Sequence, residues 1–162
     1  MAHTTESANL VWQKVRIAND SLGIDPAIVE QLLELKKNLA TAKKNPNLKF
    51  TAIDGTDAAS NDVVISDTTN TALVAIVLKK KTGTVAGFPA ISAHASAIQA
   101  AKVLILGSGA TAGKQIAAVY PKGFKVATGM TYNSVTAYNG TTKSDAADQA
   151  DGYAISIDAE IA

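Results

Sequence analysis

A glycine-rich stretch in the second half of the chain has residue types that could bind a phosphate. An apolar run over residues 103–106 leads into Gly107-Ser108-Gly109-Ala110-Thr111-Ala112-Gly113-Lys114. Between a strand and a helix, such a loop places backbone N–H groups around phosphate oxygens, and a lysine adds positive charge. A protein with that arrangement would be an enzyme or a nucleotide sensor.

The spacing of this loop argues against both phosphate-binding motifs. A P-loop needs four residues between its first glycine and Gly-Lys-Ser/Thr, but five separate Gly107 from Gly113, and Gln115 replaces the hydroxyl residue. The dinucleotide pattern G-x-G-x-x-A is matched from Gly107, yet the acidic residue expected about 20 positions later is missing. Pro121 also leaves little room for a following helix. We therefore predict two antiparallel strands joined by this loop, with its glycines at positive φ, and a nucleotide-binding enzyme is the least favoured function.

Other common catalytic and metal sites lack their residues. The chain has no cysteine, which excludes thiolate metal sites and cysteine nucleophiles. Its histidines are His3 and His94, and no G-x-S-x-G motif accompanies them. The acidic residues Asp54, Asp57, Asp62 and Asp67 lack the spacing of a calcium loop. We predict a non-enzymatic protein with no catalytic residue, no cofactor and no metal.

Charge is unevenly distributed along the chain. Residues 68–144 hold eight lysines and no acidic residue, whereas residues 145–162 hold five acidic residues. Either basic and acidic strands pair within one sheet, or complementary faces meet between subunits or on a partner. The central segment has no arginine and no aromatics interleaved with lysines, so we expect no nucleic acid partner. The longest apolar run has seven residues, well below the roughly 20 of a membrane helix, so we expect no membrane partner.

The N-terminal part is predicted to be an arm over residues 1–50 with one helix. Asp25 is a suitable N-cap and Pro26 a suitable first residue, and the helix should run to about residue 45, before Pro46. Residues 10–18 could be a short helix or a strand, and their Val, Trp and Ile favour the strand.

Apolar residues of this arm are the candidate partner-binding residues. Four of them form a heptad seam that could pack on the protein's own domain or on another protein, and a tryptophan could be an anchor or an interface residue. They are Trp12, Ile28, Leu32, Leu35 and Leu39.

Residues 51–162 are predicted to form a β-sandwich body. Short runs rich in Val, Ile and Thr alternate with turn dipeptides such as Asp54-Gly55 and Asp151-Gly152. The predicted strands cover residues 62–66, 71–78, 85–91, 98–106, 115–120, 124–128, 132–138 and 153–161. In the last of them, odd-numbered residues are apolar, which predicts one face on the core and one face in water or against a polar neighbour. The predicted fold is mainly β, a jelly-roll-like sandwich with a helical arm.

The C-terminal half also carries a recognisable motif. Residues 120–131 read Tyr-Pro-Lys-Gly-Phe-Lys-Val-Ala-Thr-Gly-Met-Thr, followed by a strand rich in Ser, Thr and Tyr, an acidic loop over residues 145–148 and a closing strand. This order resembles a group of small β-sandwich proteins from the structural gene clusters of tailed phages, in which F/Y-P-x-G leads into F-A-T-G-L. The resemblance covers residues 71–161, and its sharpest part is the spacing of Pro121, Gly123, Thr128 and Gly129. The chain departs from it at Val126 and Met130 and in its longer N-terminal arm.

The resemblance implies a function in the virion. It implies a decoration (cement) protein on the capsid surface, or a related head or tail protein, made in the host cytoplasm and without a catalytic site. Its partners would be the major capsid protein or other virion proteins, and a homo-oligomer, either a trimer or a dimer, is expected. The alternative is a carbohydrate- or receptor-binding sandwich, which would use Tyr120, Tyr132, Tyr138 and Tyr153.

Overall fold

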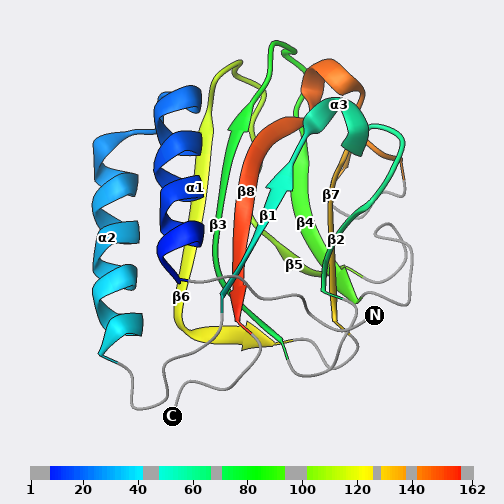
Figure 1. Ribbon diagram of the computed structural model, residues 1–162. Helices are drawn as coiled ribbons and strands as arrows, with labels where there is room; N and C mark the ends of the chain where they lie inside the picture. Colours follow the sequence, from blue (N-terminus) through cyan, green and yellow to red (C-terminus); the bar gives the residue numbers. More distant parts are fainter. Residues whose placement is uncertain are drawn as a thin grey trace.

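The computed structural model describes residues 8–41, 48–66, 71–93, 102–125, 129–137 and 142–157. This part of the chain is mainly β, as predicted, with two antiparallel four-stranded sheets and three α-helices (Figure 1). The first, the helix-covered sheet, has the order β1 (Leu48–Ile53), β8 (Ala150–Ile157), β3 (Ala72–Lys80), β6 (Gln115–Lys125). The second, the outer sheet, has the order β2 (Val63–Ser66), β7 (Met130–Val135), β4 (Phe88–Ala93), β5 (Lys102–Ile105). The helices are α1 (Ala8–Leu22), α2 (Pro26–Ala40) and the short α3 (Gly55–Ala58), and a 3-10 turn covers Ala146–Asp148.

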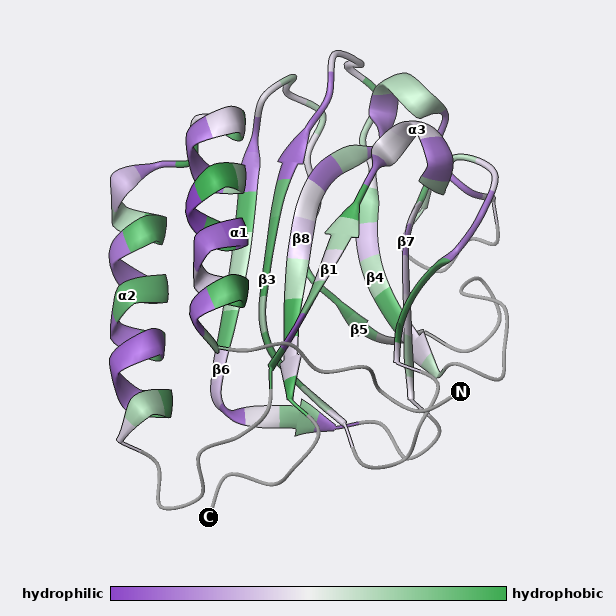
Figure 2. Ribbon diagram, in the orientation of Figure 1, coloured by the Kyte–Doolittle hydropathy of each residue, from purple (hydrophilic) through white to green (hydrophobic). Residues whose placement is uncertain are grey.

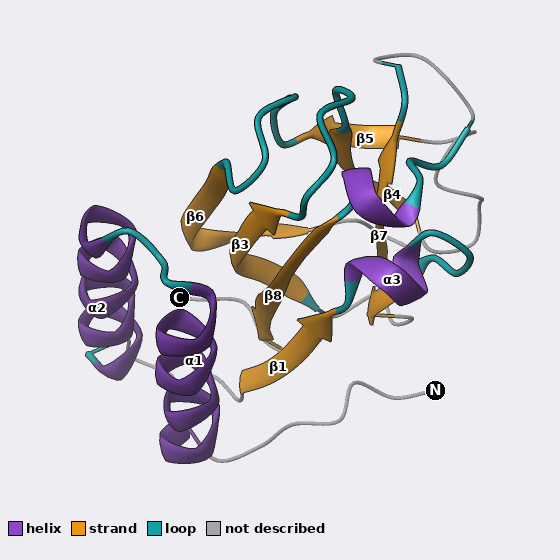
Figure 3. Ribbon diagram, turned by 90° about the horizontal axis from the view of Figure 1, so that it is seen from above, coloured by secondary structure: helices purple, strands orange, loops and turns teal. Residues whose placement is uncertain are grey.

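The molecule has three layers. Helices α1 and α2, the helix layer, lie on one face of the helix-covered sheet, and the outer sheet lies on the opposite face (Figure 3). One apolar core fills the space between the two sheets, with Ile76 and Tyr132 among its largest buried side chains. A second core fills the space between the helix layer and the sheet, around Val77 and Ile155. Both faces of β3 are therefore buried, which explains its continuous apolar sequence (Figure 2).

Strands pair in a nested order. The first strand pairs with the eighth, the second with the seventh, the third with the sixth and the fourth with the fifth, all antiparallel. The chain thus behaves as one long two-stranded ribbon that is rolled up so that its successive pairs alternate between the two sheets.

Several predicted strands differ from the observed ones. Strand β1 was not predicted. The two predicted runs over residues 115–120 and 124–128 belong to one strand, β6, which is described as far as Lys125. Residues 126–128 lie outside the described residues. β6 tolerates Pro121 because it lies at the edge of its sheet, where no neighbour needs the missing N–H. Gly123 has φ +83°, next to a register shift in the pairing with β3.

The predicted strand over residues 10–18 is wrong, since these residues lie in α1. The buried residues of α1 are Val11, Val15 and Asn19, which are spaced four apart and so share one helix face. A strand would have placed Ile17 and Val15 on the same face, in the core, but Ile17 is 68% exposed.

The strand β8 also differs from its prediction. Its alternating pattern predicted one wet face, but Ala154 and Ser156 are as fully buried as Tyr153 and Ile155. The reason is the outer sheet, which packs on the face that carries Ala154, whereas the helix layer packs on the opposite face with Tyr153 and Ile155. Residues 158–161 of the predicted strand lie outside the described residues.

The predicted helix is confirmed at its start. The side chain of Asp25 accepts a hydrogen bond from the N–H of Ala27 at 2.8 Å, and Pro26 is the first helical residue. The helix ends at Ala40 with Thr41 as its C-cap, earlier than the predicted residue 45. β1 spans the predicted boundary at residue 50, and the described helices share a core with the sheet.

Candidate protein-binding face on the helix layer

The helix layer is attached to the sheet by apolar side chains from both helices. Leu32, Leu35 and Leu39 of α2 are each less than 5% exposed, and they pack in one core with Val11 and Val15 of α1. Burying a side chain of this size contributes about 1.5–3 kcal/mol. Three leucines of the predicted seam are thus buried in the protein's own core. For these three residues, the structure shows the first of the two predicted alternatives, a helix packed on its own domain.

The turn between α1 and α2 is fastened to the sheet by polar side chains. Gln115 of β6 donates to the carbonyl of Gly23 at 3.0 Å and accepts from the N–H of Asp25 at 2.7 Å. Lys79 of β3 donates to the carbonyl of Leu22 at 2.7 Å. These bonds satisfy a backbone turn that begins with Gly23 at φ +64°, and they fix where the helix pair lies on the sheet.

A groove, called the helix groove, opens between α1 and α2. Its volume is about 340 Å³. Its apolar lining includes Trp12, Val15, Ile24, Val29 and Leu32. Its remaining lining residues are Arg16, Asn19, Asp20, Leu33 and Lys36. The groove therefore combines an apolar floor with charges of both signs, a pattern found in protein-binding surfaces.

Two predicted site residues stay accessible. Trp12 is half-buried, packs against the helix-layer core and lines the helix groove. Ile28 is also half-buried against the same core. Partner binding by Trp12 and Ile28 stays a prediction.

Sequence reasoning missed the most exposed apolar side chains of the layer. Leu33 of α2 is 58% exposed at the helix groove, and Ile17 and Leu10 lie on the flank of α1 away from it. Three of the five large exposed hydrophobic side chains in the described residues belong to this layer. One feature of the sequence could have indicated that Leu33 is exposed: it is not one of the four residues of the heptad seam.

The glycine loop has no helix after it. It runs from β5 at the edge of the outer sheet to β6 at the edge of the helix-covered sheet, so it crosses between sheets. The predicted strand pair across this loop is therefore wrong, because β5 pairs with β4 and β6 pairs with β3. Gly113 alone of its glycines has positive φ, at +80°, and Lys114 donates to the carbonyl of Ser108 within the loop.

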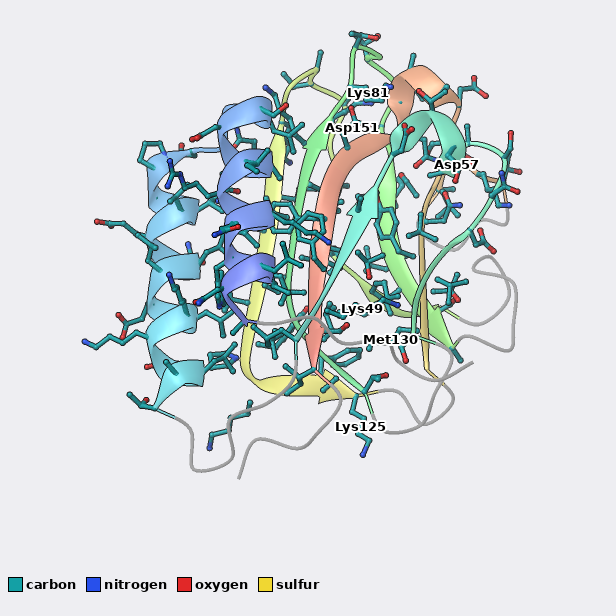
Figure 4. The ribbon with its side chains drawn as sticks, in the orientation of Figure 1. Lys49, Asp57, Lys81, Lys125, Met130 and Asp151 are labelled. Atoms are coloured by element: carbon teal, nitrogen blue, oxygen red, sulfur yellow. The ribbon has the colours of Figure 1, made fainter. Side chains whose placement is uncertain are left out.

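A buried ion pair closes one end of the sheets. The Nζ of Lys80 lies 3.0 Å from Oδ1 of Asp148, and both side chains are largely buried. The same Asp148 oxygen accepts from the N–H of Val85 at 3.0 Å. This end also carries Lys81 and Asp151, which Figure 4 shows near α3. The pair fastens the 3-10 turn to the end of β3.

An amide cluster holds the loops beside this pair. Asn133 donates to the carbonyl of Ala58 and to Asp62, both at 2.9 Å. Gln149 donates to Oδ1 of Asn133 at 2.9 Å and to the carbonyl of Ser144 at 3.1 Å. These bonds join α3, β7 and the segment before β8, so the cluster's chemistry is structural.

The tyrosines proposed for sugar binding do not form an exposed platform. Tyr132 and Tyr153 are fully buried, and burial raises the pKa of both hydroxyls above its usual value. Burial also raises the pKa of Tyr120, which packs on Phe124 with ring centroids 5.6 Å apart. Tyr138 lies outside the described residues.

Comparison with known proteins gives no relative. No family model, no curated protein and no solved structure matches the chain. Among the described residues, no cluster of three or more His, Cys, Asp or Glu could hold a metal ion. Within the same residues, no helix has the length and apolar character needed to cross a membrane.

Proposed function

We propose that this chain is a structural protein of a tailed-phage virion, a decoration protein that binds and stabilises the capsid through protein–protein contacts. Its partners in this proposal are the major capsid protein or other virion proteins, and its location is the capsid surface. The observation that carries the proposal is the nested strand order, together with the phage-type motif in and after β6.

The strand order supports a jelly-roll sandwich. In a jelly roll, eight strands form two facing sheets from two Greek keys, as if a long hairpin were rolled up. The orders β1-β8-β3-β6 and β2-β7-β4-β5 fit a rolled-up hairpin. Each strand from the first four in the chain is bonded only to strands from the last four. Jelly rolls recur in viral capsid and lectin domains. The fold alone does not select between these functions, so the surface must be considered.

The surface favours protein binding over sugar binding. Sugar-binding faces need exposed aromatic side chains, but Tyr132 and Tyr153 are in the core. The exposed flank of α1 instead presents Ile17 and Leu10, which are seven residues apart and so lie on one side of the helix. We infer that another protein covers these two exposed apolar side chains.

The experiment is co-sedimentation of the purified full chain with undecorated capsid shells of its phage. We expect the wild-type protein to bind, and Ile17→Asp to lower occupancy at least tenfold because it places a charge in the contact. Val85→Asp is the matched control, since Val85 is 59% exposed and lies away from the helix layer. Absence of wild-type binding, or equal binding by both variants, would contradict the proposal.

Removing residues 1–46, a simpler test of the arm, would be uninformative. Such a deletion would uncover Val74, Val77 and Ile155, which the helix layer buries. A loss of binding would then report unfolding of the sheet, so point variants on the surface are the appropriate test.

A further inference from the structure

One side chain in the lining of the helix groove has hydrogen-bond donors without an acceptor. Asn19 lines the groove and is only 8% exposed. Its Oδ1 accepts the hydrogen bond of the Tyr153 hydroxyl, which fixes the orientation of the amide. Its Nδ2 carries two N–H donors, and the described residues provide no acceptor for them.

This amide nitrogen can be reached from the groove. In the described part of the chain, the unpartnered side-chain atoms that are sealed from solvent belong to Thr51, Ser92, Tyr132 and Gln149. Nδ2 of Asn19 is not among them, so part of its surface is open, and the groove is the open space that Asn19 lines. A largely buried donor at such a place favours a ligand that brings a hydrogen-bond acceptor.

The apolar lining of the groove indicates the rest of the ligand. α1 and α2 lie side by side and form the walls of the groove (Figures 1 and 3). Trp12, Val15 and Leu32 provide an apolar surface along it. Its volume of about 340 Å³ lies within the range of small-molecule pockets, roughly 300–1,000 Å³. The groove is thus suited to a small ligand with an apolar body.

The charged residues of the lining favour an anion. Arg16 and Lys36 are positive, whereas Asp20 alone is negative. In the part of the chain that the structure describes, neither cation has a carboxylate within ion-pair distance. Arg16 lies three residues before Asn19, so the two side chains share one side of α1. A carboxylate at this place can accept hydrogen bonds from both, and bonds between charged groups are the stronger ones.

We propose that the helix groove binds a small amphipathic carboxylic acid in its ionised form. The carboxylate lies on Nδ2 of Asn19 and on the guanidinium of Arg16, and the apolar part of the ligand lies along Trp12. Such a ligand fills the groove and leaves the outer surface of the helix layer open. The proposed capsid function uses the flank of α1 with Ile17, so this site goes beyond that function and does not depend on it.

The first measurement is a titration of the full chain with octanoate, followed by tryptophan fluorescence. Trp12 is the only tryptophan of the chain, so its emission reports on the groove. We expect a saturable blue shift with octanoate and no shift with acetate, which lacks the apolar chain. Octan-1-ol lacks the charge and should bind at least about tenfold more weakly. No saturable shift with octanoate, or equal affinity for octanoate and octan-1-ol, would overturn the proposal.

Variants of α1 test the two polar contacts. Asn19→Asp keeps an oxygen for the Tyr153 hydroxyl but replaces the N–H donors by a negative charge, so it should weaken octanoate binding at least about tenfold. Arg16→Gln should weaken the binding of octanoate and leave that of octan-1-ol unchanged. Ile17→Asp, on the flank of α1 away from the groove, is the matched control and should bind octanoate like the wild type.

A variant at an exposed position keeps the test decisive if the buried change at Asn19 prevents folding. Leu33 lines the groove and is 58% exposed, so Leu33→Asp adds a negative charge beside the ligand without disturbing the core. It should weaken octanoate binding severalfold, because like charges repel. Unchanged affinity in Asn19→Asp or Leu33→Asp, with circular dichroism showing the variant folded, would contradict the proposed position of the carboxylate.

The two proposals are separable by experiment. Octanoate binding by a protein that does not sediment with shells would support the groove site and contradict the decoration function. Binding to shells without a fluorescence response to octanoate would support the decoration function and overturn the groove site.

Discussion

Tyr153 of β8 donates a hydrogen bond to Oδ1 of Asn19 on α1 at 2.6 Å. Both side chains are buried in the contact between the helix layer and the sheet. Asparagine is a poor helix former, and this bond explains why one lies on the buried face of α1. By contrast, the hydroxyl of Tyr132, between the two sheets, has no hydrogen-bond partner in the part of the chain that the structure describes.

The two tyrosines should therefore respond differently to loss of the hydroxyl. Tyr153→Phe should lower the free energy of unfolding by about 1–2 kcal/mol, because Asn19 is left buried without its donor. Tyr132→Phe should leave stability unchanged or raise it, because it removes an unsatisfied buried hydroxyl. Urea unfolding of both variants measures the difference. Equal destabilisation by the two changes would show that Tyr132 has a partner after all.

Alkaline pH should destabilise the protein through the same residues. Burial raises the pKa of Tyr132 and Tyr153 above the ordinary value of about 10, and the charge of Asp151 adds to the effect on Tyr132. A raised pKa means that the folded state keeps its protons where the unfolded state loses them. This contribution to the free energy of unfolding is complete below about pH 10. Above that pH, it falls by up to ~1.4 kcal/mol per pH unit for each tyrosine.

Unfolding in urea between about pH 9 and 11.5 checks this dependence, together with tyrosinate absorbance of the folded protein. Each Tyr→Phe variant should show a shallower decline than the wild type. Lysine titration contributes equally to all three proteins, so only the difference in slope is diagnostic. Identical slopes would contradict the assignment to these tyrosines.

Breaking the buried pair of Lys80 and Asp148 should be costly. Lys80→Met should lower the free energy of unfolding by about 3 kcal/mol, because it leaves a carboxylate largely buried without its cation. Adding Asp148→Asn should recover most of the loss, since asparagine removes the charge but keeps an oxygen for the N–H of Val85. Denaturant unfolding of the double-mutant cycle measures the coupling.

A second ion pair provides the control for this cycle. The Nζ of Lys143 lies 3.4 Å from Oδ1 of Asp62, and both side chains are more exposed than those of Lys80 and Asp148. Lys143→Met should cost less than about 1 kcal/mol. A similar cost for both lysines would mean that burial does not determine the strength of the Lys80 pair.

Glycine substitutions should separate close packing from loop conformation. A Cβ on Gly152 of β8 would lie 1.9 Å from the carbonyl oxygen of Val77, so Gly152→Ala should prevent soluble expression or lower stability by more than about 3 kcal/mol. A Cβ on Gly107 would lie 3.2 Å from the side chain of Ile116, which can move, so Gly107→Ala should change stability by less than about 1 kcal/mol. Thermal unfolding compares them, and a larger loss from Gly107→Ala would contradict the observed packing.

Local chemistry predicted the elements that depend on neighbouring residues. The start of α2 follows from Asp25 and Pro26 alone, because a cap is formed by adjacent residues. The strands β2 and β3 follow from their β-branched sequences. The mainly β class was predictable for the same reason.

Elements that depend on distant layers were not predictable in this way. The alternation in β8 predicted a wet face, but the outer sheet covers the face that carries Ala154, and the pattern of one strand does not report what packs on it. Asp151-Gly152 was predicted as a turn, yet Gly152 lies within β8 where it passes close to Val77. In the candidate site, the seam of α2 was visible as a pattern, but only packing distinguished its buried leucines from the exposed Leu33.

The position of β8 between β1 and β3 has a consequence for synthesis on the ribosome. The helix layer and β1 are made first, but the surface on which they rest includes Tyr153 and Ile155. The apolar faces of the helices therefore cannot pack on the complete sheet until residue 157 has left the ribosome. The contacts that complete this layer thus join distant parts of the chain, and such contacts slow folding.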